Sequence, residues 1–240
     1  MSAPEEAASG EQPSSLVDRV MSEVSRHIRD NTLPVGATLP SEAEFAARAG
    51  VSRAVAREGF RGLAALKLID IGNGRRARVA AADETVTSLL IEHAVHTKQV
   101  NIQQILDVRR SIELRTVVLA ALRRTTREAS DITSIAEEML QRFDEPTRVM
   151  ELDMSFHELV ARASRNPLFS LLVGSFRVIT HETWAIGWAS RPNDEARRES
   201  VGSHSLIASA IEARNPQAAE RAMADHFDLT IKALLNAGVT

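Results

Sequence analysis

Cysteine and tyrosine are both absent from the 240 residues of this chain. Without thiols the chain can form neither disulfide bonds nor a thiolate metal site nor a cysteine nucleophile, so a bound metal would have to use His, Asp or Glu ligands. Aromatic residues make up only 4% of the sequence, whereas hydrophobic residues make up 44%. Leu, Ile, Val and Ala must therefore fill the cores, and this composition favours helices.

The sequence also lacks the apolar run of about 18 residues or more that a membrane-spanning helix needs. Its first residues, MSAPEEAASGEQP, do not have the basic-then-apolar order of a secretory signal. We therefore expect a cytoplasmic protein without a membrane partner. A length of 240 residues fits two modest domains better than one, because domains typically contain about 100 to 150 residues.

The formal net charge of −3 is unevenly distributed along the chain. Residues 14–80 contain 11 basic and 7 acidic residues, a balance of +4, whereas residues 81–240 contain 18 and 22, a balance of −4. Three glutamates within the first 13 residues supply the remaining charge of −3. A basic first third joined to an acidic remainder indicates that one region meets phosphates and the other does not.

Residues 1–13 show no hydrophobic periodicity, and we expect a disordered tail there. From residue 14 to residue 80 the pattern predicts three helices followed by a β-hairpin. The helices are expected to begin at Ser14 or Ser15, at Ser41 and at Ser52, because Ser is a favoured N-cap. Three helices and a hairpin within about 65 residues are typical of a winged helix-turn-helix domain.

From residue 84 to residue 235 every segment has helical periodicity, and no strand is indicated. Capping residues and prolines divide this region into six or seven helices, with breaks at residues 125–128, 144–146, 166–167, 191–193 and 215–216. The expected fold class is therefore mainly α, with an N-terminal winged helix-turn-helix and a C-terminal all-helical bundle.

Three arginines lie on one face of the predicted third helix. Arg53, Arg57 and Arg61 are spaced i, i+4, i+8, and an arginine stripe at the start of a recognition helix can bond guanine or clamp phosphates in the major groove. Arg75 and Arg76 add positive charge on the hairpin, where a wing would follow the DNA backbone. The alternative is a solvated charged face. The order of short helix, tight turn, serine cap and basic hairpin favours DNA binding.

This region closely resembles the helix-turn-helix of the GntR family. The resemblance is carried by Leu39-Pro40-Ser41-Glu42, Gly50-Val51-Ser52-Arg53, Arg57-Glu58 and Leu63. It implies that Ser52, Arg53 and Arg57 contact DNA and that Asn73 and Gly74 form the wing tip. The departures are Ala43 in place of an expected arginine, Ala54-Val55-Ala56, Arg76 in place of a wing glycine, and Gly59, which we expect to weaken the helix by roughly 1 kcal/mol.

In the predicted helical region, Asp153 and His157 are four residues apart and project to the same side of a helix. His204 and His226 also fall on apolar helix faces. Three histidines that converged with one carboxylate would suit Zn²⁺, Ni²⁺ or Mn²⁺. From spacing alone, however, a lone histidine on an apolar face is more often a hydrogen-bonded core residue than a metal ligand.

The segments 153–158 and 163–168 are similar to FCD, the C-terminal ligand-binding domain of the FadR subfamily. The resemblance covers about residues 84–235 and implies a metal held by Asp153, His157, His204 and His226. It also implies an effector site. Arg109, in a segment that resembles an early helix of this domain, is the candidate to bind an effector carboxylate; the alternative is an ordinary i, i+4 pair with Glu113.

The function expected from these features is transcription regulation. A homodimer would bind double-stranded operator DNA, most simply as a repressor, and a small organic acid bound at the metal would control that binding. One alternative is a metal-dependent enzyme, but the sequence offers no second catalytic carboxylate or general base, so we expect no enzyme. Another alternative is a regulator whose metal is purely structural.

Overall fold

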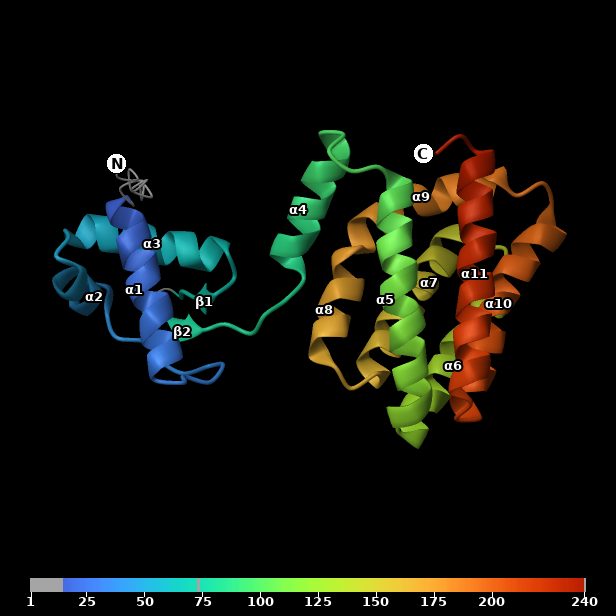
Figure 1. Cartoon of the computed structure of the whole chain (residues 1–240), viewed down its shortest axis with the longest axis horizontal. Coiled ribbons are helices and arrows are strands. Elements are labelled where there is room, and N and C mark those ends of the chain that lie inside the picture. The colour runs from blue at the N-terminus through green and yellow to red at the C-terminus, as the bar shows by residue number, and fades with distance from the viewer. Residues whose placement is uncertain (1–14, 73, 240) are drawn as a thin grey trace, which may run out of the picture. The chain divides into compact units, whose positions relative to one another are not determined.

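The computed structural model describes residues 15–72 and 74–239. The chain divides into two compact units, residues 1–83 and 84–240 (Figure 1). The element order is three helices and two short strands, followed by a run of helices to the C-terminus. Within the described residues, no helix is long and apolar enough to cross a membrane.

The N-terminal unit is built from three helices and a hairpin. The helices are α1 (Leu16–Asp30), α2 (Glu42–Ala49) and α3 (Arg53–Ala65), and the strands are β1 (Ile69–Asp70) and β2 (Arg78–Val79). The strands pair antiparallel, and a bridge from Thr38 to Arg78 adds a third extended segment. Each helix starts at a serine cap, Ser15, Ser41 or Ser52, as the sequence predicts.

Two glycines determine how α2 and α3 are placed. Gly50 ends α2 in the left-handed conformation, φ 63°, which glycine adopts without strain and which allows the tight turn into α3. Gly59 lies where α3 crosses α1, because a Cβ there would be only 2.7 Å from Cγ1 of Val20. The helix weakening expected of Gly59 is therefore compensated by the close approach of two helices.

The C-terminal unit contains eight helices in the part of the chain that the structure describes. They are α4 (Thr85–His96), α5 (Ile102–Arg123), α6 (Thr126–Gln141), α7 (Pro146–Ala163), α8 (Pro167–Ser175), α9 (Arg177–Ser190), α10 (Asp194–Glu212) and α11 (Pro216–Asn236). Helices α8 and α9 are separated by Phe176 alone, so the bundle has seven helices when that pair is counted as one bent helix.

The bundle is organised around α7, the helix that carries Asp153 and His157. Helix α7 packs against α5 and α6, and α11 packs against α5 and α10, so that α5 and α11 run side by side (Figure 1). A single apolar core fills the space between these helices, with Phe156 and Phe227 among its fully buried side chains. This packing brings residues of α7, α10 and α11 to one point inside the bundle.

Candidate functional sites

The arginine stripe of α3 lies on the surface of the N-terminal unit. Arg53, Arg57 and Arg61 are exposed, whereas Phe60 and Leu63 are buried in the core, so α3 presents one face to solvent and one to the core. Arg57 makes a loose ion pair with Glu42 at 3.5 Å, and Arg61 pairs with Glu58 at 2.9 Å. Such exposed pairs contribute little to stability and leave the guanidinium groups available.

Ser52 caps α3. Its Oγ accepts a hydrogen bond from the backbone N–H of Val55 at 3.3 Å, which leaves its hydroxyl proton free to donate outward. The N-terminus of α3 therefore presents a hydroxyl next to Arg53.

The wing and the recognition helix share one hollow. It is lined by α3 arginines Arg53 and Arg57 and by wing residues Gly74, Arg75 and Arg76. Both wing arginines are exposed, and Gly74 has φ 69° at the turn. Asn73, the other predicted wing-tip residue, lies outside the described residues. The structure thus brings the arginines of two separate sequence segments together around one solvent-facing hollow.

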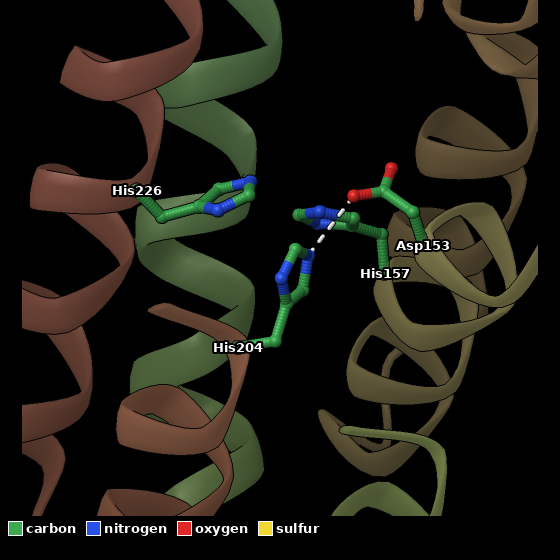
Figure 2. A group of neighbouring side chains, drawn as sticks. All are labelled: Asp153, His157, His204 and His226. Atoms are coloured by element: carbon green, nitrogen blue, oxygen red, sulfur yellow. Dashed lines mark ion pairs between the residues drawn. The ribbon is translucent and has the colours of Figure 1, made fainter. Parts of the chain in front are cut away.

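The four candidate metal ligands converge in the C-terminal unit. Asp153 and His157 project from α7, His204 from α10 and His226 from α11 (Figure 2). One ligand atom from each lies within 4.8 Å of those of the others. The three imidazoles are buried, and the Asp153 side chain is 13% exposed. The structure therefore brings together four residues that are up to 73 positions apart in the sequence.

Two of the imidazoles are oriented by hydrogen bonds at Nδ1. The Glu113 carboxylate accepts from Nδ1 of His157. Nδ1 of His226 lies 2.9 Å from Oγ of Ser203, whose own hydroxyl donates to the Ser200 carbonyl at 2.6 Å. Because the Ser203 proton is already committed, His226 must be the donor. In both rings the proton is on Nδ1, and Nε2 keeps its lone pair.

The third imidazole, that of His204, is also oriented by a hydrogen bond at Nδ1. Nδ1 of His204 lies 3.1 Å from the carbonyl oxygen of Val201, which can only accept. Its Nε2 atom lies 3.0 Å from Oδ1 of Asp153 but has no well-oriented hydrogen-bond partner among the described residues. A proton or a metal ion between this nitrogen and the carboxylate oxygen would satisfy both atoms. A carboxylate and three Nε2 lone pairs, each fixed by a partner at Nδ1, form a donor set that fits a divalent metal.

The electrostatics of the cluster keep its donors in the forms that bind metal. Burial alone would raise the pKa of Asp153, but the close approach of the His204 imidazole, with His157 and His226 nearby, lowers that pKa below its ordinary value. Burial lowers the pKa of His226 well below 6.5, and the neighbouring imidazoles lower it further. Asp153 is therefore ionised and His226 neutral at neutral pH.

Arg109 supports the cluster from α5. Its Nε donates to Glu113 at 2.8 Å and its Nη1 donates to Oγ1 of Thr180 at 2.7 Å. Burial of Glu113 would raise its pKa, but His157 and Arg109 together lower it to about 2. The i, i+4 pair between Arg109 and Glu113 is therefore present, and the second oxygen of Glu113 links this pair to His157.

A cavity opens directly onto the cluster. All four cluster residues line it, as do Arg109, Arg191 and two tryptophans, Trp184 and Trp188, whose rings stack with centroids 4.9 Å apart. His181, on the same helix as the tryptophans, is exposed and does not line this cavity. The cavity places apolar, cationic and metal-ligating groups around one small space.

Sequence reasoning missed several residues of this site, among them Glu113 as the partner of His157 and Arg191 in the cavity wall. Glu113 appeared only as a possible partner of Arg109. Arg191 appeared only as a helix boundary, because Pro192 follows it.

The fold and the basic surface define a DNA-binding protein of the winged helix-turn-helix class. Residues 16–79 match the family described as bacterial regulatory proteins, gntR family, and residues 104–229 match the FCD domain. The chain belongs to the GntR family and carries a C-terminal FCD domain, as FadR-like members do. It is a DNA-binding transcriptional regulator, a class distinct from enzymes.

Characterised relatives are similar over most of the chain. The Glc operon transcriptional activator of Escherichia coli strain K12 is 29% identical over 220 residues, covering 88% of this chain and 85% of that protein. The HTH-type transcriptional repressor NanR of Salmonella typhimurium strain LT2 is 29% identical over 222 residues, covering 89% and 82%. A solved GntR structure from Streptococcus agalactiae shares the fold, with TM-score 0.65, 23% identity and coverage of 90% and 99%.

Proposed function

We propose that this regulator binds operator DNA as a homodimer and that a small organic acid, bound next to a divalent metal in the FCD domain, controls this binding. The observation that carries the proposal is the arrangement of the three buried histidines, each with Nδ1 beside a fixed oxygen and all with one ligand atom within 4.8 Å of the others and of Asp153. A core that needed only packing would not direct three lone pairs and a carboxylate at one another.

On the DNA side, the α3 face would enter the major groove and the wing would follow the backbone. We assign Ser52, Arg53 and Arg57 to base or phosphate contacts at the start of α3, and Arg61 to the same face one turn later. Asn73, Gly74, Arg75 and Arg76 would form the wing contact. The shared hollow of α3 and the wing supports this assignment because it gathers four arginines around one solvent-facing space.

On the metal side, Asp153, His157, His204 and His226 would hold Zn²⁺, Ni²⁺ or Mn²⁺. A divalent metal with four protein ligands can supply further coordination positions to oxygen donors. Glu113 fixes the tautomer of His157, as carboxylates commonly do behind metal-binding histidines.

An effector carboxylate would occupy the cavity beside the cluster. Arg109 lines this cavity, and because Nε donates to Glu113 and Nη1 donates to Thr180, Nη2 keeps both of its N–H groups for an effector. A regulator whose metal is purely structural is the second candidate. The cavity favours the first, since a structural metal needs no adjoining space.

The sign of regulation is proposed as repression, in which the effector releases the operator. The relatives named above include one activator and one repressor. Measuring operator affinity with and without effector decides the sign: release supports repression, and tighter binding contradicts it.

The DNA assignment is tested by Arg53→Ala combined with Arg57→Ala. We expect each substitution to weaken operator binding by about 1 to 3 kcal/mol in a titration at fixed salt. Arg29→Ala, an exposed arginine on α1 that does not line the hollow, is the control and should bind as the unmodified protein does. Retained operator affinity in the double variant would contradict the recognition-helix assignment.

The metal assignment is tested by His204→Ala and His226→Ala. We expect purified protein to contain about one first-row transition metal per chain and each variant to lose metal, thermal stability and effector response together. DNA binding should survive, because the N-terminal unit has its own core. Full effector response in metal-free protein would contradict the mechanism, and metal binding without any effector would favour the structural alternative.

A further inference from the structure

Three side chains that can ligate a metal lie together on the surface of the C-terminal unit. Glu92 and His96 are four residues apart on α4, and Glu182 lies on α9. One ligand atom from each lies within 4.8 Å of those of the others. None of the three lines the cavity beside the Asp153 cluster. The group is therefore separate from the candidate metal site inside the bundle.

The packing of α4 against α9 holds these side chains side by side. Ile91 and Val95 of α4 and Ile179 of α9 belong to one small apolar cluster. Ile91 and Val95 directly precede the two α4 ligands, and Ile179 lies three positions before the α9 ligand. The apolar contact that joins the two helices therefore also places the three polar side chains at the edge of that contact.

The distances within the group are closer to those between ligands of one metal ion than to those of hydrogen bonds. Nε2 of His96 lies 3.5 Å from Oε1 of Glu182 and 3.9 Å from Oε1 of Glu92. Both distances exceed the roughly 2.7 to 3.2 Å of an N–H···O hydrogen bond. Ligand atoms about 2.0 to 2.1 Å from a tetrahedral ion lie about 3.3 to 3.4 Å from one another, so shifts of a few tenths of an ångström would complete a site.

The charges of the group also favour a cation. The two carboxylates repel each other, and a neutral imidazole does not offset their charge. Among the described residues, neither carboxylate makes an ion pair with a lysine or an arginine. The side chains are partly exposed, 37% for Glu92, 56% for His96 and 42% for Glu182, so an ion can reach them from solvent. One imidazole nitrogen and two carboxylate oxygens suit Zn²⁺, with water in the fourth position.

We propose that Glu92, His96 and Glu182 form a second divalent-metal site, which holds Zn²⁺ between α4 and α9. The ion would fasten a weakly attached helix, because α4 has no buried residue and no side-chain hydrogen bond at its N-cap. A helix with so few buried contacts opens locally at low cost, and a ligand that binds only the docked form opposes that opening. The proposal does not depend on the proposed metal inside the bundle.

The test is a calorimetric titration of full-length protein with Zn²⁺ after removal of bound metal with a chelator. We expect His96→Ala and Glu182→Gln each to bind one Zn²⁺ per chain fewer than the unmodified protein. His93→Ala is the matched control, because His93 is an exposed histidine of the same helix that is not one of the three ligands. It should bind as many ions as the unmodified protein. Without metal, all three variants should unfold at the temperature of the unmodified protein, since exposed ion pairs contribute little to stability.

Hydrogen exchange locates the ion on the chain. Zn²⁺ should slow amide exchange in residues 85–96 of the unmodified protein and of His93→Ala, but not in those of His96→Ala. The slowing should persist in His226→Ala, which lacks a ligand of the cluster inside the bundle.

Equal numbers of bound Zn²⁺ in His96→Ala and the unmodified protein would overturn the proposal. A loss in His93→Ala as large as that in His96→Ala would also overturn it. A single binding event that His96→Ala abolishes would support the surface site and contradict the metal inside the bundle. A single event that only His226→Ala abolishes would do the reverse.

Discussion

Replacement of Glu113 by glutamine removes one charge from the centre of the C-terminal unit with little change of shape. Glu113 is 1% exposed and accepts from both His157 and Arg109, so both of its oxygens are committed to donors. A glutamine can accept from only one of them. If its NH₂ group faces His157, the imidazole proton moves to Nε2, and the ring can no longer ligate a metal through that atom.

The expected magnitudes follow from burial. Arg109 is 10% exposed, and removal of one member of a buried ion pair costs about 3 to 5 kcal/mol. We expect a stability cost at the lower end of this range, about 3 kcal/mol, because Thr180 and the glutamine oxygen still accept from the Arg109 guanidinium. A loss of about 3 kcal/mol lowers the midpoint of thermal unfolding by about 6 to 12 °C in a domain of this size. The loss of metal affinity should be about 10- to 100-fold.

Two measurements separate these effects. Thermal unfolding of chelator-treated protein reports the stability cost without metal, and competition with a chromophoric chelator reports the metal affinity. The double variant Glu113→Gln with Arg109→Met removes the unpaired cation. It should recover much of the apo stability but none of the metal affinity, because His157 still lacks its carboxylate partner.

The reasoning would be refuted by a Glu113→Gln variant that binds metal as tightly as the unmodified protein. It would also be refuted if the double variant regained metal affinity together with stability. In either case the orientation of His157 would not depend on Glu113.

Three further outcomes are expected. Arg76→Ala should weaken binding to all DNA sequences similarly and reduce the slope of log affinity against log salt by about 1, as loss of a phosphate contact does; a changed sequence preference would contradict this. Gly59→Ala should lower the midpoint of thermal unfolding despite the better helix propensity of alanine, because its Cβ would lie 2.7 Å from a valine of α1. Gly62→Ala is the control: its Cβ meets only a flexible methionine, and the thermal midpoint should change little. The pKa of His226 is lowered in the folded state, so the unfolded state binds the extra proton as pH falls. The metal-free protein should therefore lose stability as pH falls through about 6.5, the ordinary pKa of histidine. Urea unfolding at several pH values measures this loss, and a free energy of unfolding that stays constant between about pH 7.5 and 5.5 would contradict it.

Local sequence signals predicted most of the helix boundaries. The caps at Ser41, Ser52, Thr125 and Asn193 all begin helices, because a side-chain oxygen satisfies free backbone N–H groups wherever the chain folds. The break at Phe176 was missed. It has no proline and no side-chain cap, and it depends on the packing of Phe176 and Ile179 against α5.

The candidate metal site was only partly accessible to sequence reasoning. The spacing of Asp153 and His157 places both on one helix face, but nothing local indicates that His204 and His226 reach the same point. That convergence depends on the packing of α7, α10 and α11, and the resemblance to FCD domains supplied it. Glu113 was missed as a partner of His157 for the same reason, since the two residues are 44 positions apart.

The physical cost of this cluster explains why a metal is the simplest account of it. A buried carboxylate and three imidazoles whose ligand atoms converge within 4.8 Å would destabilise a bundle that had only to fold. Ser203 and the Val201 carbonyl fix the orientations of the His226 and His204 rings, but neither group supplies a positive charge. A cation reverses the sign of these interactions, and its binding stabilises the folded domain by about 4 kcal/mol at a concentration 1,000 times its dissociation constant. A site that is costly when empty and stabilising when filled couples the stability of the C-terminal unit to metal. The cavity beside the cluster is therefore the place where we expect a small acid to change that stability most.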